Sequence, residues 1–241
     1  MNRRLYIIIG AQRSGKSFFS NQLIEKYKAA GNSAIVYNLG KPTDFKAARE
    51  IFLMSQRQHA AILGKSYKEQ PFFRYYEDQD QVKDFYNFSP ENAGRAVKAA
   101  RLDLTAERLF FESFFKYISN SLLVIDDARA IFRNGVKAEF LTIFSRLNHC
   151  GRFNPVTNWQ AAGADVIIIF HSLDHVNQEL FDYATHIINF KYAMRPNFDR
   201  VDNEDIRKHL QNCFSALEKA PQYSYTVTDI HNSKSKLFIK Q

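Results

Sequence analysis

Short apolar runs recur along the chain, and each is followed by glycine or polar residues. The runs are Leu5–Ile9, Ala34–Tyr37, Leu122–Ile125, Ala164–Phe170 and His186–Phe190. Their length and their β-branched residues predict buried strands. After the first run, apolar residues recur at helical spacing from Phe18 to Tyr27, and Gly31-Asn32 gives a stop signal. The pattern predicts an α/β fold with a mainly parallel sheet.

Residues 44–120 interrupt this pattern and are predicted to form an insertion of helices and a hairpin. We expect a helix over Asp44–Leu63, hairpin strands in 71–76 and 82–88, and helices beginning at Ser89 and Thr105. A further amphipathic helix is predicted over Glu139–Leu147. Residues 203–241 are predicted to form a C-terminal helix, Asn203–Lys219, and a hairpin of Tyr223–Ile230 with Lys236–Lys240. We interpret the chain as a single domain, 1–241.

A glycine-rich loop directly follows the first predicted strand and precedes the first predicted helix. Its residues match the phosphate-binding pattern G-x-x-x-x-G-K-S. Backbone amides of such a loop hold the α- and β-phosphates of a nucleotide, Lys16 reaches the β- and γ-phosphates, and the Ser17 hydroxyl binds magnesium. The predicted ATP-binding residues are Gly10, Ala11, Gln12, Arg13, Ser14, Gly15, Lys16, Ser17 and Phe18. The alternative is a glycine turn without a ligand. The loop predicts a three-layer P-loop NTPase core of the RecA/ASCE type.

Two carboxylates end the strand predicted at Leu122–Ile125. Asp126 is predicted to bind Mg²⁺ together with Ser17, and Asp127 occupies the position of the general base that activates water. His171 ends the next strand, where it could sense the γ-phosphate or orient the attacking water; the alternative is a capping or core histidine. His171 and His175 are four residues apart, but no further ligands with metal-binding spacing accompany them.

Composition adds a possible polyanionic partner and excludes some classes of protein. The formal net charge is +8 with a pI near 9.4, which favours binding to a polyanion over a merely solvated basic surface. The chain has only two cysteines, so a disulfide framework is not indicated. No stretch approaches the roughly 18 apolar residues of a membrane span, and we expect a soluble protein without a membrane span.

The order of these motifs resembles the FtsK/HerA superfamily of DNA-pumping ATPases. The resemblance covers Leu5–Asp44 and Ser121–Lys191, and it is most particular over Phe144–His171. Within the superfamily the chain looks most like viral genome-packaging ATPases and is also similar to the Zot-like assembly ATPases of filamentous phages. The chain departs from the family pattern at two positions, because Asp127 stands where Glu is usual and His171 stands where Gln is usual.

The resemblance implies a homo-oligomeric ring in which an arginine from the next subunit completes each active site. Arg146 and Arg152 are the candidates, with Arg129 behind them; the alternative for each is a surface salt bridge or a DNA contact. It implies an ATP-hydrolysing translocase that packages viral double-stranded DNA into a capsid, with single-stranded DNA as the alternative substrate. Capsid vertex proteins are further expected partners. The expected location is the host-cell cytoplasm or the virion.

Three other functions stay open at this point. A Zot-like assembly or secretion ATPase would share the same motifs. A nucleotide-gated assembly scaffold would bind ATP without turnover, which the shorter Asp127 permits. A nucleoside or nucleotide kinase would need an acceptor site and an arginine-rich lid, and neither is evident in the sequence.

Overall fold

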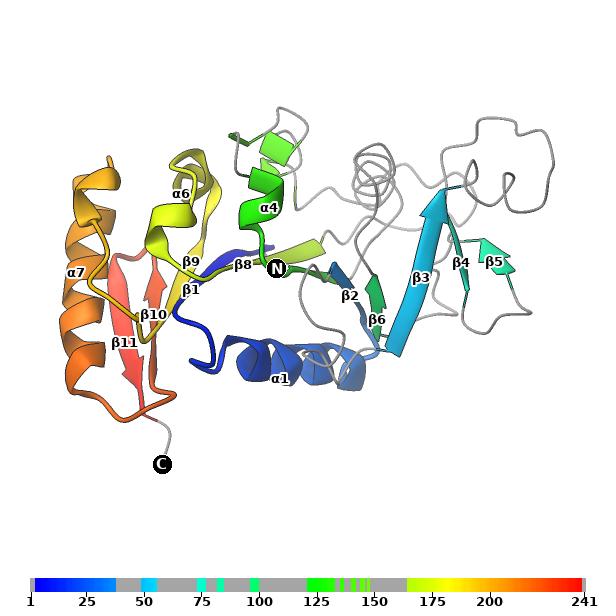
Figure 1. Cartoon of the computed structure of the whole chain (residues 1–241), viewed down its shortest axis with the longest axis horizontal. Helices are drawn as coiled ribbons and strands as arrows, with labels where there is room; N and C mark the ends of the chain where they lie inside the picture. Colours follow the sequence, from blue (N-terminus) through cyan, green and yellow to red (C-terminus); the bar gives the residue numbers. More distant parts are fainter. Residues whose placement is uncertain are drawn as a thin grey trace. The chain divides into compact units, whose positions relative to one another are not determined.

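The computed structural model describes residues 3–37, 49–55, 73–76, 82–84, 96–99, 121–132, 135–136, 140–141, 144–145, 147 and 164–239 (Figure 1). The chain forms two compact units, each built from segments that are distant in the sequence. We call the unit of Arg4–Ser20, Ile125–Ser145 and Val166–Gln241 the phosphate-loop unit, and the rest the second unit. The single-domain interpretation of 1–241 stays a prediction.

Five neighbouring strands form the sheet of the phosphate-loop unit, in the order β11-β10-β9-β1-β8 (Figure 1). Their bounds are β1 Leu5–Ile9, β8 Ala164–Phe170, β9 His186–Phe190, β10 Tyr225–Asp229 and β11 Lys234–Phe238. β1 runs parallel to both neighbours, with Ile9 opposite Phe170 on β8 and Asn189 on β9. The carboxyl ends of three strands therefore meet at one edge, where open α/β sheets bind their ligands.

Continuous apolar runs fill this sheet because its central strands are buried on both faces. Every residue of β8 is buried, and so are Leu5, Ile7, Ile8 and Ile9 of β1. The three predicted strands of this unit are confirmed. The C-terminal hairpin is also confirmed, since β10 pairs antiparallel with β11, which begins at Lys234, two residues before its predicted start.

Helices of the described residues lie where loops leave the sheet. They are α1 Lys16–Ala29, α4 Arg129–Phe132, α6 Glu179–Tyr183 and α7 Glu204–Lys219, with single 3-10 turns at Leu173–His175 and Phe198–Arg200. α7 buries one apolar stripe, consisting of Ile206, Leu210, Cys213 and Leu217. The helices predicted after the phosphate loop and near the C-terminus are confirmed. In the predicted helix Glu139–Leu147, the described residues Phe140, Leu141 and Phe144 are helical.

The second unit holds a run of strands in the order β7-β2-β6-β3-β4-β5. Their bounds are β7 Ser121–Ile125, β2 Ser33–Tyr37, β6 Ala96–Ala99, β3 Arg49–Ser55, β4 Phe73–Tyr76 and β5 Val82–Asp84. The predictions of β2 and β7 are confirmed. β4 and β5 pair antiparallel, as predicted for the hairpin in the insertion.

Two helix predictions in the insertion are wrong where the structure describes the chain. Arg49–Ser55 lies inside the predicted helix Asp44–Leu63 but forms β3, and Ala96–Ala99 follows the predicted helix start at Ser89 but forms β6. β6 pairs in parallel with both β2 and β3. Pairing with two neighbouring strands overrides the helix propensity of alanine, because tertiary context outweighs a weak local preference. The helix predicted from Thr105 lies outside the described residues.

Candidate nucleotide site

Backbone hydrogen bonds fix the predicted phosphate loop between the ends of two strands. The Gly10 amide donates to the carbonyl of Phe170 at the end of β8, with an N–O distance of 3.3 Å. The Ala11 amide donates to the carbonyl of Lys191, directly after β9, over 2.8 Å. The loop therefore starts from a position that is held on both sides at the carboxyl edge of the sheet.

The two glycines of the loop motif lie where a side chain would not fit or would strain the backbone. A Cβ atom on Gly10 would lie 2.6 Å from the Cβ of Phe190 and 3.0 Å from the Ser14 Oγ. Gly15 has a φ of +107°, which is a conformation that L side chains rarely adopt. The loop can close tightly only because both positions lack a side chain, and this explains the motif spacing in physical terms.

The ammonium group of Lys16 points into the phosphate loop. The Nζ atom donates to the carbonyl oxygens of Gly10 and Ala11 over 2.7 and 2.6 Å. The residue is only 5% exposed, and this burial lowers the pKa of Lys16 from 10.5 to about 8, while the charges of Asp126 and Asp127 act to raise it. A buried ammonium near two carboxylates is thus placed where anionic phosphates would enter.

The loop also carries donors that match a phosphate ligand. The Ser14 Oγ is buried and, within the described part of the chain, has no hydrogen-bond partner. α1 begins at Lys16 and has no acidic residue in its first turn, so no side chain of the helix itself offsets the positive end of its dipole, which faces the loop. These features fit a nucleotide triphosphate held along Gly10–Ser17, as the sequence predicts.

Asp126 and Asp127 follow β7 and belong to the phosphate-loop unit. The Ala128 amide donates to the carbonyl of Ile169 on β8 over 3.0 Å, which holds the acidic turn beside the end of that strand. Asp126 is 6% exposed, whereas Asp127 is more open to solvent and has a φ of +48°. Such a left-handed backbone at a non-glycine residue is strained, and strained residues cluster at functional sites.

His171 lies close to Asp127, as the sequence places both at strand ends. The His171 Nε2 is 3.9 Å from the Asp127 Oδ1, and both side chains are partly exposed. At this distance the two side chains form an ion pair when the imidazole is protonated, and they are too far apart for a direct hydrogen bond.

A magnesium ion at this site would find few protein ligands among the described residues. Within the described residues, no three His, Cys, Asp or Glu side chains are grouped to hold a metal ion. Mg²⁺ at a nucleotide site commonly takes one or two carboxylates and completes its shell with phosphates and water. Ser17 at the start of α1 and Asp126 at the end of β7 fit that chemistry.

The candidate arginines are only partly covered by the structure. Arg146 and Arg152 lie outside the described residues. Arg129 opens α4 and is exposed. Burial lowers the pKa of His175, the Arg129 charge lowers it further, and Asp174 and Asp127 act in the opposite direction. Arg129 and Asp127 thus both act electrostatically on His175.

Phe190 and Lys191 belong to the site but were not predicted from the sequence. Phe190 forms the wall behind Gly10, and the carbonyl of Lys191 accepts the hydrogen bond from Ala11. The available signal was positional, because Phe190 ends a predicted parallel strand and Lys191 follows it, at the edge where the loop lies. The contacts of Phe190 and Lys191 with the loop depend on the path of the backbone, so the identity of these residues does not reveal them in the sequence.

Comparisons with known proteins identify the fold. The genome packaging NTPase B204 from Sulfolobus turreted icosahedral virus 2, in complex with ATP-gammaS, matches with a TM-score of 0.62 at 17% identity over 98% of each chain. The same NTPase in complex with sulfate has a TM-score of 0.61 at 16% identity, covering 100% of this chain and 98% of that one. B204, the DNA-packaging ATPase from Sulfolobus turreted icosahedral virus, has a TM-score of 0.58 at 19% identity over 100% of both chains.

This chain shares the α/β fold of these packaging NTPases. The predicted α/β fold with a mainly parallel sheet is therefore confirmed. Neither the family models nor the curated proteins gave a match. None of the helices in the described residues has the length and apolar character needed to cross a membrane.

Proposed function

We propose that the chain is an ATP-hydrolysing DNA translocase that packages viral genomic DNA into a capsid. The observation that carries this proposal is the Lys16 ammonium, buried inside the loop within electrostatic reach of Asp126 and Asp127. A loop of this kind binds the phosphates of a nucleotide. The shared fold supports the packaging role, since two of the similar proteins are a genome packaging NTPase and a DNA-packaging ATPase by name.

The chemistry proposed for the site is the transfer of a phosphoryl group to water. Lys16 and the loop amides hold the phosphates, and the Ser17 hydroxyl and Asp126 carboxylate hold Mg²⁺, which neutralises phosphate charge when bound. Asp127 accepts the proton of the attacking water. His171, 3.9 Å from Asp127, orients that water or senses the γ-phosphate. Arg146 or Arg152 of a neighbouring copy stabilises the charge on the transferring group.

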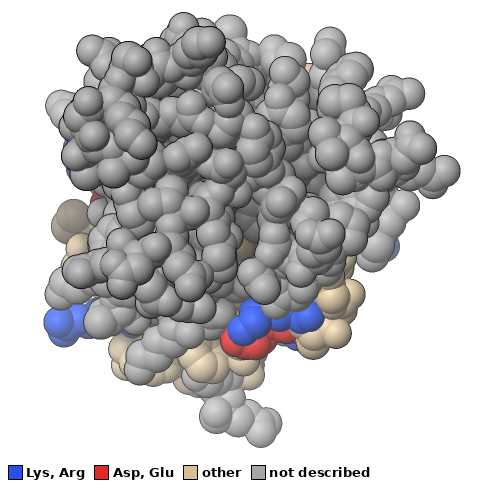
Figure 2. Space-filling view, turned by 90° about the vertical axis from the view of Figure 1, so that its right-hand side faces the viewer, with Lys and Arg blue, Asp and Glu red and all other residues tan. Residues whose placement is uncertain are grey.

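The proposed partner is double-stranded DNA, which passes through the channel of a homo-oligomeric ring. Capsid vertex proteins are proposed as further partners. The proposed location is the host cytoplasm or the virion. The net charge of +8 favours a polyanionic partner. On the face drawn in Figure 2, the described residues show Lys and Arg side chains together with Asp and Glu side chains. The proposal therefore rests on the charge of the whole chain and not on a patch of one sign on that face.

The test is an ATPase assay on the full chain, with and without double-stranded or single-stranded DNA, together with a mass measurement of the assembly with nucleotide. We expect turnover that double-stranded DNA stimulates at low salt, and a closed ring. Lys16→Ala should abolish ATP binding or turnover while the far-UV circular dichroism is retained. Hydrolysis without stimulation by DNA and without a ring would overturn the translocase proposal, and binding without turnover would identify a nucleotide-gated scaffold instead.

A further inference from the structure

Tyr223 lies beside the phosphate loop, although it is distant in sequence and belongs to the connection between α7 and β10. The Tyr223 Cδ1 is 3.4 Å from the position that a Cβ atom on Gly15 would occupy. The residue is 44% exposed, which makes it one of the few large hydrophobic residues among the described residues with so much surface open to solvent. An aromatic ring thus borders the loop and keeps part of its surface accessible.

The backbone at Tyr223 is held in an unfavourable conformation. Its φ is +68°, in the left-handed region that only glycine and occasionally asparagine adopt readily. The turn around it is closed by the Ser224 amide, which donates to the carbonyl of Pro221 over 3.3 Å. A bulky side chain persists at such a position only when its surroundings fix it, and strain of this kind is common at ligand-binding sites.

An aromatic cluster anchors the strand that follows Tyr223 against the phosphate-loop wall. The ring of Tyr225 packs against Phe19 of α1 at 5.1 Å and against Phe190 of β9 at 5.3 Å, measured between ring centroids. Tyr225 also stacks on Phe238 of β11 at 5.0 Å with an interplanar angle of 9°. Because Phe190 borders both loop glycines, the cluster packs Tyr225, two residues after Tyr223, against the wall of the loop.

We infer that Tyr223 is the platform on which the base of the bound nucleotide stacks. This inference rests on the proposed function, since it assigns the base of the same nucleotide whose phosphates the loop holds. Every nucleobase has a π-face, so stacking on an aromatic side chain supports binding with little dependence on base identity. The platform explains why a large aromatic side chain occupies a backbone position that favours glycine.

Calorimetric titration of the full chain with ATP, GTP and inorganic tripolyphosphate separates the base from the phosphates. Tyr223→Ala should weaken ATP and GTP binding roughly 5- to 150-fold, the range of base stacking on an aromatic side chain. The affinity for tripolyphosphate, which has no base, should not change. Tyr223→Phe, which keeps the ring, should bind ATP like the wild type.

Two further variants keep the test independent of folding. Tyr223→Gly suits the left-handed backbone, so its thermal midpoint should equal or exceed that of the wild type while ATP affinity falls as in Tyr223→Ala. The matched control is Ile239→Ala, which removes another exposed apolar side chain (57%) from the hairpin end and should leave all three affinities unchanged. If the ratio of ATP affinity to tripolyphosphate affinity is the same in Tyr223→Ala and in the wild type, the stacking role of Tyr223 is overturned and the proposed function is not. If the wild type binds neither ATP nor tripolyphosphate, the proposed function is overturned.

Discussion

Individual residues in the candidate nucleotide site are placed well for a ligand but lower the stability of the fold. Lys16 is buried with its charge, and Asp127 adopts a left-handed backbone. Both features are unfavourable for stability by themselves, because burial disfavours a charged group and because φ above zero strains a non-glycine residue. The site residues therefore lend themselves to tests in which function and stability change in opposite directions.

Replacing Lys16 with Met should remove nucleotide binding and also change how stability depends on pH. The pKa of Lys16 is about 8 in the folded chain and near 10.5 when exposed, so between these values the unfolded chain binds more protons and stability rises with pH. From pH 7.5 to 9.5 the wild type should gain about 2 kcal/mol in unfolding free energy relative to Lys16→Met. Urea denaturation of both proteins at the two pH values measures this difference, and parallel pH profiles would contradict the burial of the charge.

Replacing Asp127 with Asn should separate nucleotide binding from hydrolysis. Asparagine tolerates the left-handed φ of +48° at least as well as aspartate, so the fold and the ATP affinity should be kept. Loss of the proton acceptor should lower kcat roughly 100-fold or more. Steady-state kinetics and equilibrium binding provide the two measurements, with exposed Asp182→Asn on α6 as the control; unchanged turnover in Asp127→Asn would remove the base assignment.

Secondary-structure elements were predicted best where a local pattern and the final packing agree. The strands β1, β7, β8 and β9 were predictable because each is a short, mainly apolar run, and α7 because an N-cap precedes an amphipathic stretch. β3 and β6 were not predicted, because these two strands pair with each other across a long stretch of sequence and because their residues also suit a helix. The structure brought Asp127 and His171 together as expected, but Tyr223 and Lys191 join the loop through tertiary contacts that no motif records.

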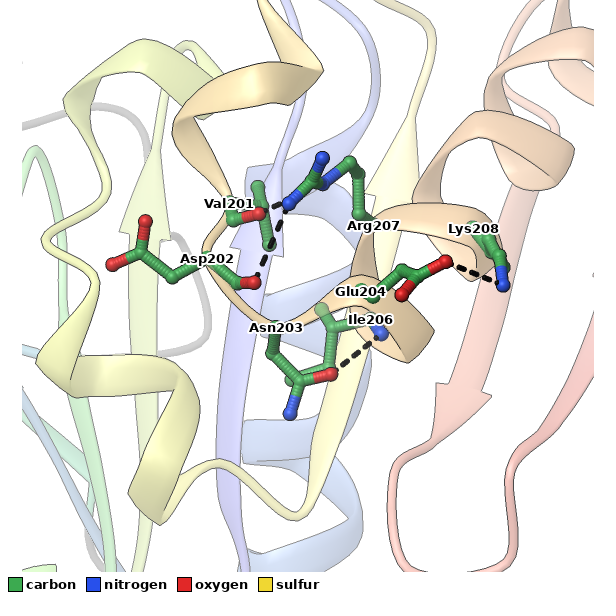
Figure 3. Close-up of polar contacts among 7 residues, drawn as sticks. All are labelled: Val201, Asp202, Asn203, Glu204, Ile206, Arg207 and Lys208. Carbon is green, nitrogen blue, oxygen red and sulfur yellow. Dashed lines mark hydrogen bonds and ion pairs between the residues drawn. The ribbon is translucent and has the colours of Figure 1, made fainter.

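The N-terminus of α7 offers a stability test at the level of one element. The Asn203 Oδ1 accepts a hydrogen bond from the Ile206 amide over 3.1 Å, and Arg207 and Lys208 make the neighbouring polar contacts drawn in Figure 3. Asn203→Ala should lower the unfolding free energy by about 1 kcal/mol. Asn212→Ala, at an exposed position inside the same helix, should be neutral or slightly stabilising; chemical denaturation of both variants decides whether the cap acts as described.

At the scale of the whole molecule, the net positive charge favours binding to the proposed partner, DNA. The excess of 33 Lys and Arg over 25 Asp and Glu residues gives the net charge of +8, and binding through phosphate contacts releases counterions from DNA. The proposed ring and the proposed role of Arg146 or Arg152 follow only from the resemblance, because contacts between copies leave no pattern in the sequence of one chain.

DNA affinity should therefore fall steeply with salt. For about six phosphate contacts, the association constant should decrease roughly 10³-fold between 50 and 200 mM NaCl. Fluorescence anisotropy with labelled duplexes of two unrelated sequences measures the slope, and the two slopes should agree because phosphates carry no sequence information. A salt-independent affinity would argue against a phosphate-tracking surface.

The phosphate loop and the strand before it are held by residues that lie far along the sequence and are synthesised late. The Leu5 amide donates to the Oγ1 of Thr185, 180 residues further on, over 3.1 Å, and the Ala11 amide needs the carbonyl of Lys191. A nascent chain therefore carries its nucleotide-binding motif well before it carries the strand that shapes the loop, and such non-local pairing slows folding. Chains stalled before residue 185 should fail to bind ATP, because they lack both Thr185 and the carbonyl of Lys191.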